Sequence, residues 1–168
     1  YNTDYQAVAN LLAASNFSTD HSVAVTGSGG MAKAVVAALR DSGFARGTVV
    51  ARNADTGPAL AQAYGYDWSA DAVGADLLVN VTPVGMAGGP DADSTPFSES
   101  QIGAASAVFD VVAMPSETPL VVAARAANKP VITGAQVIAL QAAEQFVLYT
   151  GVRPSDEQVA RASEYSRR

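Results

Sequence analysis

The sequence predicts an α/β fold built on a doubly wound parallel sheet, with helices on both faces. Short apolar segments of four to six residues alternate with helical patterns along the chain. Strands buried on both faces have this character, and they occur mainly in parallel sheets covered by helices. A glycine-rich turn leads from the first apolar segment directly into a helix. Right-handed crossovers between such strands then produce a doubly wound sheet.

Local patterns place the individual elements. The first helix is expected over 4–15, where Asp4 is a candidate N-cap and apolar residues recur at helical spacing. Strands are expected at five apolar segments, which are 23–25, 48–52, 76–81, 107–112 and 129–133. Further helices are expected after the glycine turn as far as Gly43, and at 56–64, 117–127, 135–150 and 154–165. Residues 84–96 are dense in Gly, Pro and Asp and predict a loop.

Composition is typical of one globular domain. The chain has 168 residues, of which 49% are hydrophobic and 15% are charged, which excludes a disordered chain. No cysteine is present, and His21 is the single histidine. Disulfides, a cysteine nucleophile and a histidine metal cluster are therefore excluded, and no metal site is expected.

Charge and hydropathy exclude two classes of partner. Ten basic against sixteen acidic residues give a net charge of −6. Nucleic acids and anionic membranes both attract basic surfaces, so neither is an expected partner. No apolar run approaches the roughly 18 residues of a membrane span, and the polar start lacks the features of a signal peptide. We expect a cytoplasmic protein that acts on a small molecule, as a monomer or a homodimer.

The strongest local motif is the glycine turn G-S-G-G-M-A at 27–32. It follows a strand, opens a helix and has the form G-x-G-x-x-A, which is typical of Rossmann-type dinucleotide-binding domains. The glycines permit a sharp turn and the close approach of a pyrophosphate, while the helix start offers free N–H groups. The candidate cofactor-binding residues here are Gly27, Ser28, Gly29, Gly30 and Met31. The alternative is a tight strand–helix turn with no ligand.

The end of the second strand indicates which dinucleotide is bound. NAD sites usually have Asp or Glu at this point, to hold the ribose 2′-hydroxyl. Here the chain has Arg52 and Asn53, and the nearest acid is Asp55. A guanidinium forms charge-assisted bonds with a 2′-phosphate, so NADP is favoured over NAD. The alternative for Arg52 is an ordinary solvated arginine.

Several further motifs occur in a fixed order and resemble those of shikimate/quinate dehydrogenases, including the divergent shikimate dehydrogenase-like subgroup. They are Asn2-Thr3-Asp4, the glycine loop, the Ala51-Arg52-Asn53 clamp, the N-x-T-P-x-G-M segment at 80–86, Asp110-Val111-Val112 with Thr118-Pro119-Leu120, and the glutamine-bearing helix at 141–151. The resemblance implies an NADP-dependent hydride transfer to or from a hydroxylated cyclohexene carboxylate. It also implies two domains, of which the chain contains the NADP-binding domain (1–134) and the helices that return to the substrate domain (135–168).

The resemblance also assigns roles to individual residues. It implies that Asp4 is the catalytic aspartate that binds substrate and tunes a lysine, and that Gln141 hydrogen-bonds a substrate hydroxyl. It places Gly134 and the Val111 backbone at the nicotinamide end of the cofactor. The family's lysine matches neither Lys33 nor Lys129, so the chain carries half an active site and is expected to be inactive alone.

Differences from the family pattern surround the substrate and the nicotinamide. Ala113 stands where the family usually has a tyrosine, Gln136 and Val137 replace a glycine and a methionine, and Tyr5 replaces a glycine. A non-catalytic NADP-binding regulatory module therefore remains an alternative. Another is a different enzyme with the same loop, such as a methylene-folate dehydrogenase or a glutamyl-tRNA reductase.

Overall fold

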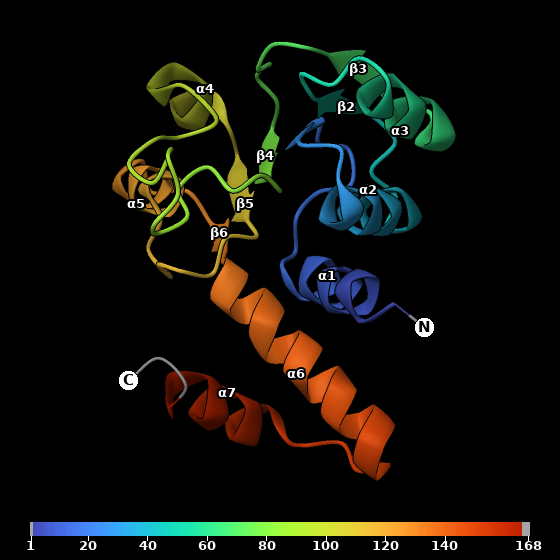
Figure 1. Cartoon of the computed structure of the whole chain (residues 1–168), viewed down its shortest axis with the longest axis vertical. Helices are drawn as coiled ribbons and strands as arrows, with labels where there is room; N and C mark the ends of the chain where they lie inside the picture. The colour runs from blue at the N-terminus through green and yellow to red at the C-terminus, as the bar shows by residue number, and fades with distance from the viewer. Residues whose placement is uncertain (1, 166–168) are drawn as a thin grey trace.

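The computed structural model describes residues 2–165 and has a six-stranded, wholly parallel sheet (Figure 1). The strand order is β3-β2-β1-β4-β5-β6, so the chain moves outward in one direction and then crosses back to continue in the other. The strands are β1 (Val23–Thr26), β2 (Gly47–Val50), β3 (Asp67–Ser69), β4 (Leu77–Asn80), β5 (Ala107–Asp110) and β6 (Val131–Ile132). The predicted doubly wound parallel fold is confirmed.

Helices cover both faces of the sheet. They are α1 (Thr3–Ala14), α2 (Gly30–Asp41), α3 (Thr56–Tyr64), α4 (Glu99–Ala104), α5 (Pro119–Ala126), α6 (Gly134–Thr150) and α7 (Asp156–Tyr165). Alternate strand residues enter two separate cores. Val23, Val25 and Val79 pack with α1, α2, α3 and α6, whereas Ala24, Leu78 and Val108 pack with α4 and α5. This alternation explains why the central strands are apolar up to their last residue.

The structure corrects the predicted number of strands, because β3 was not among the five expected. Its sequence is Asp67-Trp68-Ser69, with only one apolar residue, and it pairs on one side only, with β2. An edge strand of this kind needs no apolar run. Trp68 holds it in place, since its indole Nε1 donates a hydrogen bond to the Ala51 carbonyl at 3.0 Å. The short helix α4 was also not expected.

The N-cap of α1 is a second correction. The side-chain oxygen of Asn2, rather than that of Asp4, accepts hydrogen bonds from the N–H groups of Asp4 (3.0 Å) and Tyr5 (3.2 Å). Asp4 lies in the first turn, where its carboxylate is free of a capping role and is favoured by the helix dipole.

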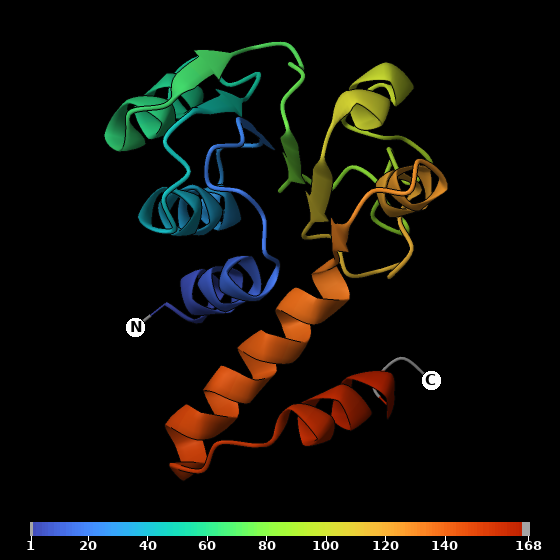
Figure 2. The ribbon, with the colours of Figure 1, turned by 180° about the vertical axis from the view of Figure 1, so that it is seen from behind.

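The last two helices extend beyond the sheet. Both ribbon views show α6 as a long helix leading away from β6, with α7 turned back beside it (Figures 1 and 2). α6 packs along α1, so a helix from the C-terminal part of the chain lies beside the first helix. Among residues 2–165, no helix is both long and apolar enough to cross a membrane.

Candidate functional site

A cleft of about 580 Å³ opens at the carboxyl edge of β1, β2 and β4. Gly27 and Ser28 of the glycine loop line one side, and Arg52 and Asn53 line another. The ends of β1 and β2 contribute Thr26, Val50 and Ala51, and the remaining lining comes from residues within 70–72, 82–84 and 91–96. Ligands of open parallel α/β sheets bind at this position, where the strand order reverses. Two parts of the predicted dinucleotide site, 25 residues apart in sequence, are therefore brought to one cleft.

The glycine loop has the geometry that the motif requires. Gly27 has φ +109°, and an added Cβ would lie 3.0 Å from the Val81 side chain, so only glycine fits without strain. Gly29 precedes α2 and Gly30 begins it, and no side chain caps this helix start. A Cβ at Gly29 or Gly30 would meet nothing within 4 Å, so the helix start is open to an approaching anion. The Met31 side chain is half-buried and packs against the main core, and Met31 is not among the residues that line the cleft.

The opposite wall presents a free cation. Arg52 is exposed at the cleft, and it forms no ion pair with any residue between 2 and 165. Asn53 shapes the turn beside it, because its Oδ1 accepts N–H bonds from Asp55 and Thr56, both at 2.9 Å. The Ser28 and Thr56 hydroxyls lie 2.7 Å apart and connect this turn to the glycine loop.

A row of buried polar side chains lies at the edge of the sheet where the central strands end. Thr26, Asn80 and Asp110 are the last residues of β1, β4 and β5, and they are neighbours in register. Thr26 Oγ1 donates toward Asn80 Oδ1 (3.1 Å), and Asn80 Nδ2 donates to Asp110 Oδ1 (3.0 Å). The predicted site residues did not include this row. Asn80 and Asp110 do occur in the family-like motifs at 80–86 and 110–112, but only the structure shows that the side chains of the row bond one another.

Asp110 is fully buried and receives two more hydrogen bonds. The Val112 N–H donates to Oδ1 (3.0 Å), and the Thr118 hydroxyl donates to Oδ2 (2.6 Å). Burial raises the pKa of the Asp110 carboxyl above its ordinary 3.8, and the hydrogen bonds from Thr118, Val112 and Asn80 partly oppose the rise. No Lys or Arg is within ion-pair distance of it among the described residues.

The two predicted substrate-side residues meet directly. Gln141 Nε2 on α6 donates a hydrogen bond of 2.6 Å to Asp4 Oδ1 on α1, across 137 positions of sequence. Both side chains are half-buried. The second carboxylate oxygen of Asp4 and the amide oxygen of Gln141 have no other partner among residues 2–165. The pair can therefore still accept hydrogen bonds from a hydroxylated ligand.

Val111 and Gly134 lie outside the cleft lining but contact each other. Val111 follows β5, and its N–H donates to the Asn80 carbonyl at 3.0 Å. A Cβ on Gly134 would lie only 2.3 Å from the Val112 carbonyl oxygen and 2.4 Å from that of Val111. The need for glycine at 134 thus has a packing cause, since the start of α6 rests directly on this backbone.

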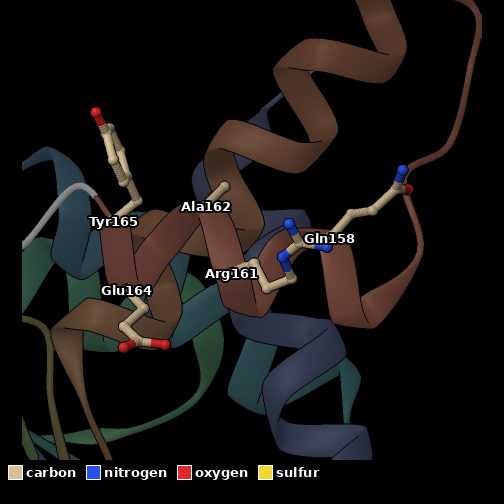
Figure 3. A pocket seen from close by; sticks show the side chains of 5 residues that line it. All are labelled: Gln158, Arg161, Ala162, Glu164 and Tyr165. Carbon is tan, nitrogen blue, oxygen red and sulfur yellow. The ribbon is translucent and has the colours of Figure 1, made fainter.

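A further hollow lies along α7, lined by Gln158, Arg161, Ala162, Glu164 and Tyr165 (Figure 3). Tyr165 and Glu164 point in opposite directions there, so the polar groups do not converge on one point (Figure 3). Within the described part of the chain, no group of three His, Cys, Asp or Glu side chains is arranged to hold a metal ion.

The topology and the glycine-loop cleft together define a Rossmann-type dinucleotide-binding domain. No protein-family model matches the chain. A curated "shikimate dehydrogenase-like protein" of Haemophilus influenzae is 50% identical over 169 residues, which cover 99% of this chain and 62% of the relative. The solved structure of a shikimate 5-dehydrogenase-like protein superposes on all of this chain and 63% of its own, with a TM-score of 0.95 and 50% identity.

A more distant structure is that of shikimate 5-dehydrogenase from Thermus thermophilus, in complex with NADP(H) and shikimate. It is 31% identical, with a TM-score of 0.84 over 98% of this chain and 62% of its own. The chain is therefore related in sequence and in structure to the shikimate dehydrogenase family, as its motifs predicted. It spans about three-fifths of the length of these relatives.

The raised pKa of Asp110 predicts a pH dependence of stability. The folded protein holds this proton at pH values where the unfolded chain has released it. The contribution of the group to stability is therefore complete below its unfolded pKa of 3.8 and declines as pH rises through the folded value. Asp110→Asn lacks this decline. We expect urea denaturation at steps between about pH 4 and pH 7 to show that the free energy of unfolding of the variant increases, relative to that of the parent chain, as pH rises.

Asp76 provides the matched control. Hydrogen bonds from the Ser22 N–H and hydroxyl lower its pKa below 3.8, so its stabilising contribution is present above that pH and is lost only at lower pH. The difference in free energy of unfolding between Asp76→Asn and the parent chain should therefore stay nearly constant over the same pH range. If the difference for Asp110→Asn also stayed constant, the carboxyl of Asp110 would have an ordinary pKa in the folded state.

Proposed function

We propose that the chain is the NADP-binding part of an oxidoreductase of the shikimate dehydrogenase type. The reaction is hydride transfer between nicotinamide and 3-dehydroshikimate/shikimate or a related hydroxy-cyclohexene carboxylate. One observation carries the proposal. A loop that needs glycine at position 27, because of its positive φ, and the unpaired Arg52 line the same cleft. The relation to a dehydrogenase solved with NADP(H) and shikimate supports it.

The chain's residues have separate tasks in cofactor binding. The backbone of Gly27 to Met31 and the open start of α2 receive the diphosphate, because they present N–H groups to an anion. Arg52 binds the 2′-phosphate, and Ser28 and Asn53 hold the two walls in place. Bound NADP supplies the hydride donor or acceptor. With the adenosine half at β2, the nicotinamide half lies toward β4 and β5, beside the Val111 backbone and Gly134.

Asp4 and Gln141 act on the substrate. Their hydrogen bond fixes both side chains, while the free Asp4 oxygen accepts a bond from a substrate hydroxyl. A carboxylate at this position also stabilises a protonated base that takes the hydroxyl proton. Neither Lys33 nor Lys129 forms an ion pair with Asp4, and neither matches the family's lysine, so we propose that this lysine belongs to the substrate domain.

The substrate domain is proposed to cover α6 and α7, residues 135–168, while 1–134 binds NADP. α6 presents Ile138, Phe146 and Leu148, each about half exposed, and an apolar hollow of about 620 Å³ lies between α6 and α7. We also infer a cytoplasmic enzyme, monomeric or homodimeric, that acts on a small-molecule substrate.

The 168-residue chain alone should bind NADP without oxidising shikimate. The phosphate loop is complete in it, whereas the proton-carrying lysine is absent. Calorimetry with NADP+ and NADPH formation with shikimate, quinate and related hydroxy acids measure the two properties, and the complete protein serves as the positive control. Lack of NADP binding, or shikimate oxidation by the isolated chain, would contradict the proposal.

Arg52→Glu should weaken NADP binding far more than NAD binding. The carboxylate repels the 2′-phosphate, and the lost charge-assisted bonds contribute about 1.5–3 kcal/mol each. Calorimetry with both cofactors measures the difference. Arg161→Glu on α7 makes the same charge change away from the cleft and should leave both affinities unchanged. Equal losses for NADP and NAD in Arg52→Glu would place Arg52 away from the 2′ position.

Asp4→Asn in the complete protein should lower kcat about 100-fold or more, because it removes the charge that tunes the base. Melting should change little, because Asn2 and not Asp4 caps α1. Asp41→Asn is the control, since Asp41 is a second carboxylate in contact with α1, through the Tyr5 hydroxyl at 2.7 Å. Near-parental kcat in Asp4→Asn would show that the carboxylate has no catalytic task.

A further inference from the structure

The buried carboxylate of Asp110 connects three segments that leave the sheet beside the cleft. Through Asn80 it is joined to the end of β4, where the Asn80 amide also donates to the Val84 carbonyl at 3.1 Å. Through Val112 it holds the backbone that follows β5, and through Thr118 it holds the start of α5. The Thr118 hydroxyl in turn accepts the Val121 N–H at 3.1 Å, so its proton is directed to Asp110.

This arrangement is specific to an acceptor at position 110. All three groups that reach the carboxylate act as donors. Because Asp110 is fully buried, water cannot take the place of any of them. Removing the acceptor would leave the Val112 N–H and the Thr118 hydroxyl unpaired in the interior. The free-energy cost of these unpaired donors decreases only if the 111–118 segment moves to find other partners.

The same segment is in contact with the start of α6. The carbonyl oxygens of Val111 and Val112 lie where a Cβ of Gly134 would be, so no side chain separates the two backbones. A shift of the segment after β5 would therefore displace the start of the helix that carries Gln141, seven residues further along.

We propose that Asp110 is a positioning residue, which holds the Val111–Val112 backbone and the start of α6 in place for the nicotinamide half of the dinucleotide. The inference rests on the proposed function, because the nicotinamide is placed beside β4 and β5 by the binding mode given above. Asp110 does not touch the ligand. It acts through the Val112 N–H and through Thr118.

Two ligands separate this role from a general loss of structure. NADP+ has both halves of the dinucleotide, whereas adenosine 2′,5′-bisphosphate occupies only the Arg52 side of the cleft. In the complete protein, Asp110→Ala should weaken NADP+ about tenfold, since a buried donor is left without its acceptor. Affinity for adenosine 2′,5′-bisphosphate should change less than about twofold, because the glycine loop and Arg52 are untouched.

Conservative and control variants complete the experiment. Asp110→Asn keeps the shape and one acceptor oxygen, and should restore most of the NADP+ affinity. If Asp110→Ala does not fold, Thr118→Val removes one donor from the same carboxylate and should show the same selective loss. Asp76→Ala removes a carboxylate that likewise accepts an N–H and a hydroxyl, but at the opposite edge of the sheet, and should leave both affinities unchanged.

The outcomes distinguish the two proposals. If the parent protein binds neither ligand, the proposed function fails. If the parent binds both, and a folded Asp110→Ala or Thr118→Val loses both equally or keeps both, then the positioning role is overturned. Selective loss of NADP+ affinity with near-parental affinity for the bisphosphate supports it.

Discussion

The hydrogen bonds that join Thr26, Asn80 and Asp110 are the constraint on which the cofactor edge of this protein depends. The strands that these residues end are buried on both faces, so their polar side chains have no water to bond and must satisfy one another. A buried group left unpaired costs about 1–3 kcal/mol, which makes the row stable only when it is complete. Each member begins a loop, and the starting directions of the three loops are therefore fixed together.

Much of the architecture could be predicted because its signals are local. The apolar strands, the glycine turn and most helices are recognisable within windows of a few residues, and all of them occur in the structure. β3 could not be predicted in this way, since a polar edge strand is held by its pairing with β2 and by Trp68. The cap of α1 was misassigned for a related reason. Asn2 and Asp4 are equally good capping residue types, and only the backbone geometry distinguishes them.

The parts of the site that lie within a local motif could be predicted, whereas the parts formed by residues far apart in the sequence could not. The glycine loop and Arg52 each have a local pattern, and the structure brings them to one cleft. The contact between Asp4 and Gln141 spans 137 positions, and only the family resemblance indicated it. Asp110 belongs to a family-like motif, but its structural role is visible only in the fold, where Asn80 and Thr118 donate hydrogen bonds to its carboxylate. Met31 shows the opposite case, because this residue lies inside the motif but packs its half-buried side chain against the core.

The close contact at Gly134 gives α6 the geometry of a lever. The helix has 17 residues and is about 25 Å long, and its first residue rests on carbonyl groups with no side chain between. A tilt of about 10° at that fulcrum would carry the far end through about 4 Å. Because α6 packs along α1, and Gln141 bonds Asp4 there, such a tilt requires α1 to move with it, and the two helices therefore hold the start of α6 against the end of β5.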